Sequence, residues 1–223
     1  MPKITLRIVL IDFILQDTSL MDYVFLRLPL YSKTEIFIRV FIFFLLSFVL
    51  WSFLRPVSLL QIIALFLIVH FINWFFNGHG FQVFYKIIGM RYSAQRAVNY
   101  ILSLKEEGKR KNLSIMIYGS WSREEASEES DLDIFIINTT SNSLKRLEAG
   151  LISLKYRLLA LFSLLSVDIY VIDEVTYLTW RREAKPKEKP IILNDPRGII
   201  KDIYRRERNM QDFIRDIFRV YKA

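Results

Sequence analysis

The sequence predicts an α/β protein in which a small mixed sheet with flanking helices is preceded by an α-helical hairpin that crosses a membrane. Two observations carry this prediction. Apolar residues dominate one stretch, since between Val40 and Phe76 only Arg55 and His70 are ionisable. After about residue 80, short apolar runs alternate with longer segments of helical spacing, an order typical of helices packed on a sheet.

The composition limits the chemistry that the chain can perform. It has 223 residues, a formal charge of +8 and no cysteine, which excludes a disulfide framework, a thiolate metal site and a cysteine nucleophile. With only two histidines, a histidine-based zinc site is not expected. The positive charge permits anionic partners such as nucleotides, nucleic acid or lipid head groups and selects none of them.

The apolar stretch is split at Arg55 and Pro56 into segments 36–54 and 57–76. At about 1.5 Å per residue, either segment as a helix would cross the ~30 Å hydrocarbon layer, so we expect a multi-pass hairpin of two spans in the cell membrane over residues 36–80, in contact with membrane lipids. A pair of buried core helices is the alternative, but little chain remains to cover it. Basic residues flank both ends and place them in the cytoplasm by the positive-inside rule. They are Lys33, Arg39, Lys86, Arg91 and Arg96.

The first 35 residues form a separate segment in this interpretation. Residues 4–15 are apolar but interrupted by Arg7 and Asp12, and no small-residue cleavage site follows them. We therefore expect residues 1–35 to be an amphipathic, interfacial segment that lies on the membrane surface or packs on the hairpin. Residues 81–223 are expected to form a cytoplasmic domain.

In that domain, helical spacing alternates with short apolar runs. The expected order is helix 93–111, strand 113–118, strand 131–138, helix 141–166 and strand 167–172, followed by a helix capped by Asp173. A charged, proline-bearing linker over 184–190 comes next, then a short strand over 198–203 and a basic C-terminal helix.

Three aspartates stand out against this apolar background. Because side chains alternate along a strand, Asp131 and Asp133 share one face while Leu132 and Ile134 point to the other. Asp168 interrupts the apolar run of the third strand in the same way. If these strands pair, three carboxylates converge on one patch, which costs stability unless a divalent cation binds there.

A Gly-Ser turn, Gly119-Ser120, follows the first strand of the domain. Glycine lets a phosphate approach the backbone closely, and a serine hydroxyl and N–H can donate to its oxygens. Mg²⁺ binds carboxylate oxygens together with substrate phosphates, and two such ions can clamp both oxygens of an in-line displacement. The pattern therefore predicts two Mg²⁺ ions, with Mn²⁺ as a substitute, at Asp131, Asp133 and Asp168.

The order of these motifs resembles that of the nucleotidyltransferase superfamily that includes DNA polymerase beta, and looks most like the minimal prokaryotic nucleotidyltransferases. Similar proteins carry an arginine within the GSxxR segment, matched here by Arg123, and a serine before the aspartate pair, matched by Ser130. The sequence departs from them at Glu124, where those relatives usually have glycine. The resemblance covers residues 92–204 and leaves the hairpin outside it.

This resemblance implies the nucleotidyltransferase fold and the transfer of a nucleoside monophosphate from an NTP, with ATP as the expected donor. Asp131 and Asp133 would hold the metals on the triphosphate, and Asp168 would help to activate the acceptor hydroxyl. Gly119 and Ser120 would bind the β- and γ-phosphates, and Arg123 would offset phosphate charge.

The identity of the acceptor stays open between a protein hydroxyl, a nucleotide, an RNA end and a small molecule. The competing interpretation is a non-catalytic membrane adaptor or regulatory module that binds a nucleotide or a partner protein through the same fold. The basic face of the C-terminal helix permits nucleic acid or anionic lipid as further partners, and we favour neither.

Overall fold

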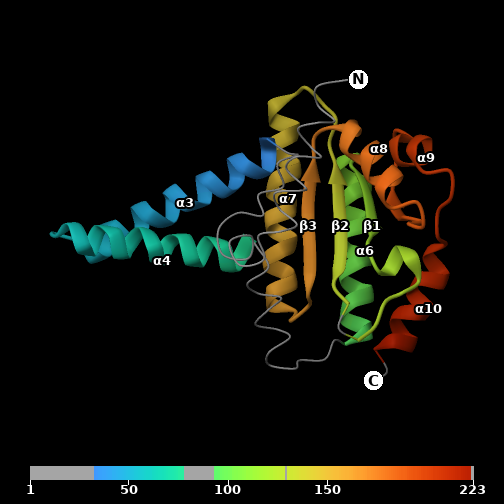
Figure 1. Cartoon of the computed structure of the whole chain (residues 1–223), viewed down its shortest axis with the longest axis horizontal. Coiled ribbons are helices and arrows are strands. Elements are labelled where there is room, and N and C mark those ends of the chain that lie inside the picture. Colours follow the sequence, from blue (N-terminus) through green and yellow to red (C-terminus); the bar gives the residue numbers. More distant parts are fainter. Residues whose placement is uncertain (1–32, 78–92, 129, 222–223) are drawn as a thin grey trace.

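The computed structural model describes residues 33–77, 93–128 and 130–221 and arranges them as a helical hairpin beside an α/β unit (Figure 1). Nearly all of the expected interfacial segment 1–35 thus lies outside the described residues. In chain order the elements are α3 (Lys33–Leu54), α4 (Leu59–Asn77), α6 (Ala94–Lys111), β1 (Ser114–Tyr118), η1 (Trp121–Arg123), β2 (Leu132–Ile137), α7 (Ser143–Phe162), β3 (Val167–Ile172), α8 (Val175–Ala184), β4 (Ile191–Asn194), α9 (Ile199–Ile203) and α10 (Met210–Val220).

The four strands form one mixed sheet in the order β3-β2-β1-β4. Strand β1 is antiparallel to both β2 and β4, whereas β2 and β3 are parallel and are joined through α7. The central strand β1 is buried along its whole length, as expected for an apolar strand covered on both faces. The predicted small mixed sheet with flanking helices is therefore confirmed.

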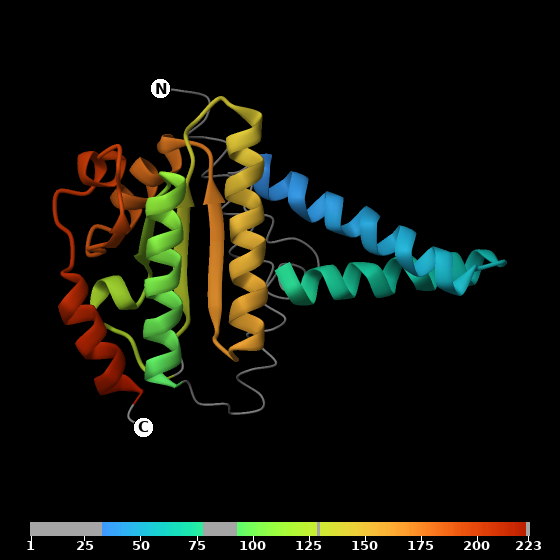
Figure 2. The same ribbon diagram turned by 180° about the vertical axis from the view of Figure 1, so that it is seen from behind.

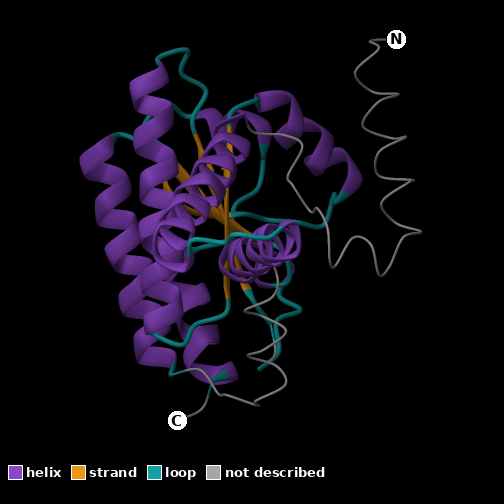
Figure 3. Ribbon diagram, turned by 90° about the vertical axis from the view of Figure 1, so that its left-hand side faces the viewer, coloured by secondary structure: helices purple, strands orange, loops and turns teal. Residues whose placement is uncertain are grey.

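Helices cover both faces of the sheet (Figure 3). Helices α6, α7 and α10 pack on one face, and the view from behind shows α6 and α7 in front of the sheet, running along the direction of its strands (Figure 2). Helices α8 and α9 cover part of the other face. Along β2, Leu132 and Ile134 belong to the first core and Phe135 to the second. The alternation predicted from the sequence is thus confirmed, and it places Asp133 on the face of α8.

Two predicted elements are wrong. The segment 198–203 was expected to be a strand but begins with Gly198 in the left-handed region and continues as helix α9, whose N-terminal N–H groups donate to Asp195. The fourth strand is instead β4, directly after the charged linker. Asp173 does not cap α8: its carboxylate accepts from the N–H and the hydroxyl of Thr34, at 3.0 and 3.1 Å, and so caps α3.

Helices α3 and α4 run side by side and project from the edge of the α/β unit formed by β3 and α7 (Figure 1). Their large apolar side chains point outward along much of the hairpin; Phe48, for example, is 71% exposed. Within the described residues, one helix, over Phe37–Leu54, is long and apolar enough to span a membrane, while the apolar part of α4 over Leu59–Ile72 is shorter. The hairpin is observed, but its two membrane spans are not.

The base of the hairpin packs closely on α7 at Gly150. A Cβ atom on this glycine would lie 1.9 Å from Cδ1 of Ile38 and 3.1 Å from Cγ2 of Thr34, and both residues are buried. We expect Gly150→Ala to lower the free energy of unfolding by about 1 kcal/mol, because a buried side chain must move to admit the methyl group. Thermal unfolding of the full chain in detergent measures the loss.

Ile38→Ala removes the side chain that the new methyl group meets, so the two substitutions together are expected to cost less than the sum of their separate effects. Strictly additive effects would contradict a direct contact between α3 and α7 at this position.

Candidate functional site

Three adjacent strands place Tyr118, Asp133 and Asp168 in one row across the sheet. Tyr118 of β1 is paired with Asp133 of β2, and Asp133 is paired with Asp168 of β3. Neighbouring strands lie about 4.8 Å apart, and paired residues on them point to the same face. The structure therefore brings two of the three predicted carboxylates side by side on the face that carries α8.

Gly119 lies directly against this row. Its φ of +76° is in the left-handed region, and a Cβ atom would lie 2.0 Å from Oδ2 of Asp133. A residue with a side chain would be strained at this φ and would also displace the carboxylate. The glycine predicted to admit a phosphate is thus the residue that allows the backbone to approach Asp133.

Burial raises the pKa of Asp133 well above its usual range, and the nearby carboxylates of Asp168 and Asp131 raise it further. The positive charge of Arg181 opposes this shift. A like-charged, partly buried cluster of this kind stores unfavourable electrostatic energy. Perturbed carboxylates in a cluster are typical of functional sites.

Two hydroxyl groups that sequence reasoning missed contact the other aspartates. The hydroxyl of Ser166, which is buried, donates to Oδ1 of Asp131 at 2.8 Å, and this bond orients the carboxylate just before β2. The hydroxyl of Tyr170 donates to Oδ2 of Asp168 at 3.4 Å. The Ser166 contact depends on the pairing of β2 with β3, whereas Tyr170 lies two residues after Asp168 on β3 and so shares its face of the strand.

The potential metal ligands in this row are carboxylate oxygens that repel one another. Such oxygen ligands suit a hard divalent cation, which would offset their repulsion. Among the residues that the structure describes, however, no group of three acidic or histidine side chains is already drawn together as a metal centre. The residues thus fit such an ion by chemistry, and binding would require the Asp131, Asp133 and Asp168 carboxylates to converge further.

The predicted phosphate-binding residues follow Gly119 in a tight turn. The carbonyl of Ser120 accepts from the N–H groups of Arg123 and Glu125 at 3.2 and 3.0 Å, which closes the turn into η1. The Arg123 side chain donates through Nε to Glu125 at 2.7 Å and through Nη1 to Glu188 at 3.0 Å. Arg123 therefore lies beside the turn, with its guanidinium engaged by two carboxylates.

The position where similar proteins usually have glycine has a distinctive backbone. Glu124 adopts a φ of +63°, in the left-handed region that glycine favours, and its side chain is exposed and paired with Lys189 at 3.5 Å. Further along the loop, the hydroxyl of Ser130 accepts from the N–H of Ser127 at 2.9 Å. The side chains of Glu124 and Glu125 are both exposed to solvent.

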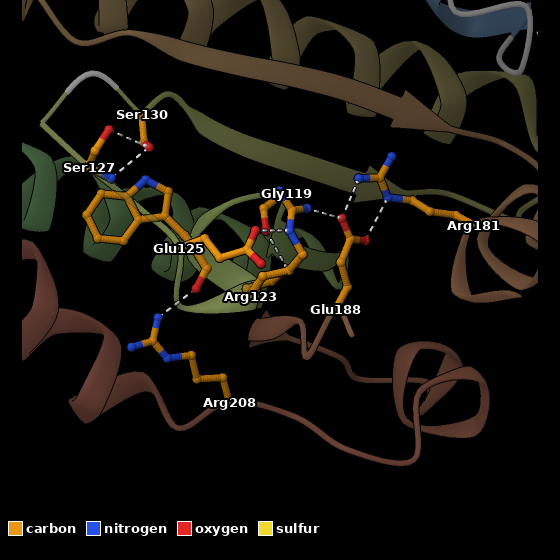
Figure 4. A network of polar contacts seen from close by, with 10 residues as sticks. Gly119, Arg123, Glu125, Ser127, Ser130, Arg181, Glu188 and Arg208 are labelled. Atoms are coloured by element: carbon orange, nitrogen blue, oxygen red, sulfur yellow. Dashed lines mark hydrogen bonds and ion pairs between the residues drawn. The ribbon is translucent and has the colours of Figure 1, made fainter. Parts of the chain in front are cut away.

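A second arginine, Arg181 of α8, shares the Glu188 carboxylate with Arg123 (Figure 4). Arg181 donates through Nε and Nη2 to Glu188 at 3.0 and 2.8 Å. Glu188 is 5% exposed although it lies in the charged segment 184–190. Its one sequence signal is that it is the only acid among the lysines of that segment. The sequence pattern of this segment predicts only a charged, proline-bearing linker and indicates a role for neither Glu188 nor Arg181.

Comparison with curated proteins and with solved structures gives no match. A family model matches a stretch of the chain that includes β1, β2, β3 and the turn at Gly119. The hairpin and α10 lie outside it. Residues 99–199 match the family described as the nucleotidyltransferase domain, and this match supports the superfamily indicated by the sequence and a nucleotidyl transfer function in general.

Proposed function

We propose that this chain is a membrane-anchored nucleotidyltransferase that transfers a nucleoside monophosphate from an NTP, with ATP as the expected donor, to an acceptor hydroxyl. The observation that carries the proposal is the contact of the Asp133 carboxylate with Gly119 in a row that continues to Asp168. The row joins the Gly119-Ser120 turn, which this proposal assigns to the phosphates, with carboxylates for cations and for the acceptor. The family match over residues 99–199 supports the same reaction.

In this proposal an acceptor oxygen forms a bond to the α-phosphorus, and the bond from that phosphorus to the bridging oxygen breaks. Pyrophosphate leaves with the electron pair of the broken bond. The acceptor proton passes to a carboxylate oxygen of Asp168 and from there to water. Gly119 and Ser120 hold the β- and γ-phosphates through the backbone, so catalysis is mainly positioning and charge neutralisation.

Asp131, Asp133 and Asp168 would hold Mg²⁺, with Mn²⁺ as a substitute. Two such ions, when bound, supply positive charge that neutralises the triphosphate and stabilises the attacking and leaving oxygens. The chain itself orients these carboxylates. For Asp131, the hydrogen bond donated by the Ser166 hydroxyl provides this orientation. The absence of a side chain at Gly119 leaves room for the Asp133 carboxylate beside the turn.

The test uses the full chain in detergent with α-labelled ATP, Mg²⁺ and a cell extract as the source of acceptor. We expect label to be transferred by the wild-type chain and not by the Asp131→Asn/Asp133→Asn double variant. An Asp202→Asn/Asp212→Asn double variant, changed at two exposed aspartates, is the matched control and should transfer label normally. Tight ATP binding without pyrophosphate release would contradict the enzyme and support the non-catalytic adaptor.

We further propose that residues 1–35 lie at the membrane surface, that the hairpin over residues 36–80 crosses the membrane twice, and that residues 81–223 are cytoplasmic. The exposed apolar side chains of α3 and α4 support this proposal, because water is a poor solvent for such a surface. Strand β2, which carries Asp133, belongs to the α/β unit from which the hairpin projects (Figure 1).

A pair of lysines in the middle of the hairpin tests its insertion. Leu45→Lys/Leu67→Lys is expected to move the protein from the carbonate-resistant membrane fraction to the soluble or aggregated fraction, at a cost of about 3 kcal/mol per lysine. Leu144→Lys/Leu151→Lys, at two exposed leucines of α7, is the matched control and should remain in the membrane. Equal fractionation of both variants would contradict insertion.

A further inference from the structure

The guanidinium of Arg181 lies on the same face of the sheet as the carboxylate row. Its Cζ is 4.3 Å from the centre of the Tyr118 ring and 5.4 Å from that of Phe135. Tyr118 is the strand partner of Asp133, and its ring stacks on Phe135 with centroids 3.7 Å apart. Arg181 is therefore held over two aromatic rings at the β1 end of the row, next to Asp133.

Glu188 fixes the orientation of this guanidinium. The bidentate contact uses Nε and Nη2 of Arg181 and leaves the Nη1 edge pointing away from Glu188 (Figure 4). Bidentate arginine–carboxylate pairs are geometrically specific, so the direction of the remaining edge is set in advance of any ligand. The pair is well shielded, since the Glu188 side chain is 1% exposed and that of Arg181 16%.

The charges around Arg181 are compatible with the binding of an additional anion. Glu188 is shared between Arg181 and Arg123, so one carboxylate faces two guanidinium groups. Arg123 has a second partner in Glu125, whereas among the described residues the ion pairs of Arg181 are with Glu188 alone. Because Arg181 shares its ion-paired carboxylate with a second guanidinium, this shielded cation can still interact with a further anion.

We propose that Arg181 is a substrate-binding residue whose Nη1 edge contacts the β- and γ-phosphates of the NTP and the pyrophosphate that leaves, and that Glu188 is the residue that positions it. This inference rests on the proposed function and names the end of the site at which the triphosphate lies. Arg181 and Gly119 are at the β1 side of Asp133, and Asp168 is at the β3 side. The triphosphate tail therefore lies toward β1 and the acceptor toward β3.

The test measures inhibition of nucleotidyl transfer by inorganic pyrophosphate, together with KM for ATP and kcat, on the full chain in detergent. We expect Arg181→Gln to weaken pyrophosphate inhibition and to raise KM by about 10- to 100-fold, because a charge-assisted contact to phosphate is lost. Arg181→Lys should recover part of the affinity, since it keeps the charge without the planar fork. Glu188→Gln should fall between Arg181→Gln and the wild type.

Arg182→Gln is the matched control, because Arg182 is the adjacent arginine of α8 and donates to the carbonyl of Ile203 and to Glu183 instead. It should leave pyrophosphate inhibition unchanged. The inference would be overturned if pyrophosphate inhibited Arg181→Gln as strongly as it inhibits the wild type. It would also be overturned if Arg181→Gln lowered the unfolding temperature but left KM and pyrophosphate inhibition unchanged. If the wild-type chain binds neither ATP nor pyrophosphate, the proposed function itself fails, which is a distinguishable result.

Discussion

Replacing Asp133 with asparagine is expected to reduce nucleotidyl transfer about 10³-fold while making the folded protein more stable at neutral pH. Activity falls because the carboxylate against Gly119 loses its charge. Stability rises because the folded protein then no longer holds a partly buried carboxylate beside Asp168 and Asp131. The gain should be about 1 kcal/mol, the scale of a like-charged pair across neighbouring strands.

The pH dependence of this gain in stability follows from the direction in which the pKa of Asp133 is shifted. The pKa of Asp133 is raised in the folded state, so its ionisation opposes folding. Below the pKa of the unfolded chain the carboxyl is protonated in both states, and wild type and variant should differ little. The difference should grow as the pH rises through the raised pKa of the folded state.

Thermal unfolding of the full chain in detergent, without divalent cations, measures this difference across the pH range. Asp202→Asn, at an exposed position of α9, should change neither activity nor stability and serves as the control. Added Mg²⁺ should stabilise the wild-type chain more than the Asp133→Asn variant. A variant that is less stable than wild type at neutral pH would contradict the clustered carboxylates.

Gly119→Ala is expected to impair both folding and transfer. The left-handed φ of +76° costs about 1–2 kcal/mol with a side chain present. The new Cβ atom would in addition meet Oδ2 of Asp133 at 2.0 Å, so the carboxylate must move. Because a small displacement of a catalytic group costs about 10²-fold in rate, we expect a loss of that size in transfer.

Gly198→Ala separates these two effects. Gly198 has a similar φ of +71°, and nothing lies within 4 Å of its Cβ position. This variant should lose about 1 kcal/mol of stability and retain its activity. Unfolding temperature and initial rate, measured on both variants, compare the two positions. Equal activity in Gly119→Ala and Gly198→Ala would show that contact with Asp133 does not matter for the reaction.

Helices and strands that have a clear local pattern of apolar residues could be predicted from the sequence alone. The apolar stripes of α6 and α7 and the apolar runs of β1, β2 and β3 predict those elements within a few residues. Strand β4 was missed because Ile191–Asn194 is short, follows a proline and gains its structure by pairing with β1. The segment 198–203 has apolar residues typical of a strand, but its helix depends on Asp195 accepting from two N–H groups.

In the candidate site too, features set by local sequence patterns could be predicted, and features set by contacts between distant residues could not. Strand alternation was enough to predict that Asp131 and Asp133 share a face, and β-sheet register then places Asp168 beside Asp133. Arg181 and Glu188 could not be found this way, because their pairing depends on how the 184–190 segment folds back on the turn at Gly119. Asp173 was assigned to the wrong helix for a related reason: its partner, Thr34, is 139 residues away in the chain.

The central claim is that the row of Gly119, Asp133 and Asp168 transfers a nucleoside monophosphate. The most direct measurement supplies the full chain with Mg²⁺ and ATP labelled either at the α- or at the γ-phosphate, and counts the pyrophosphate released for each label incorporated. We predict that only the α-label enters the acceptor, with one pyrophosphate per transfer, and that Asp133→Asn lowers the rate of both about 10³-fold. Transfer of the γ-label, or α-label incorporation at the wild-type rate in Asp133→Asn, would contradict the claim.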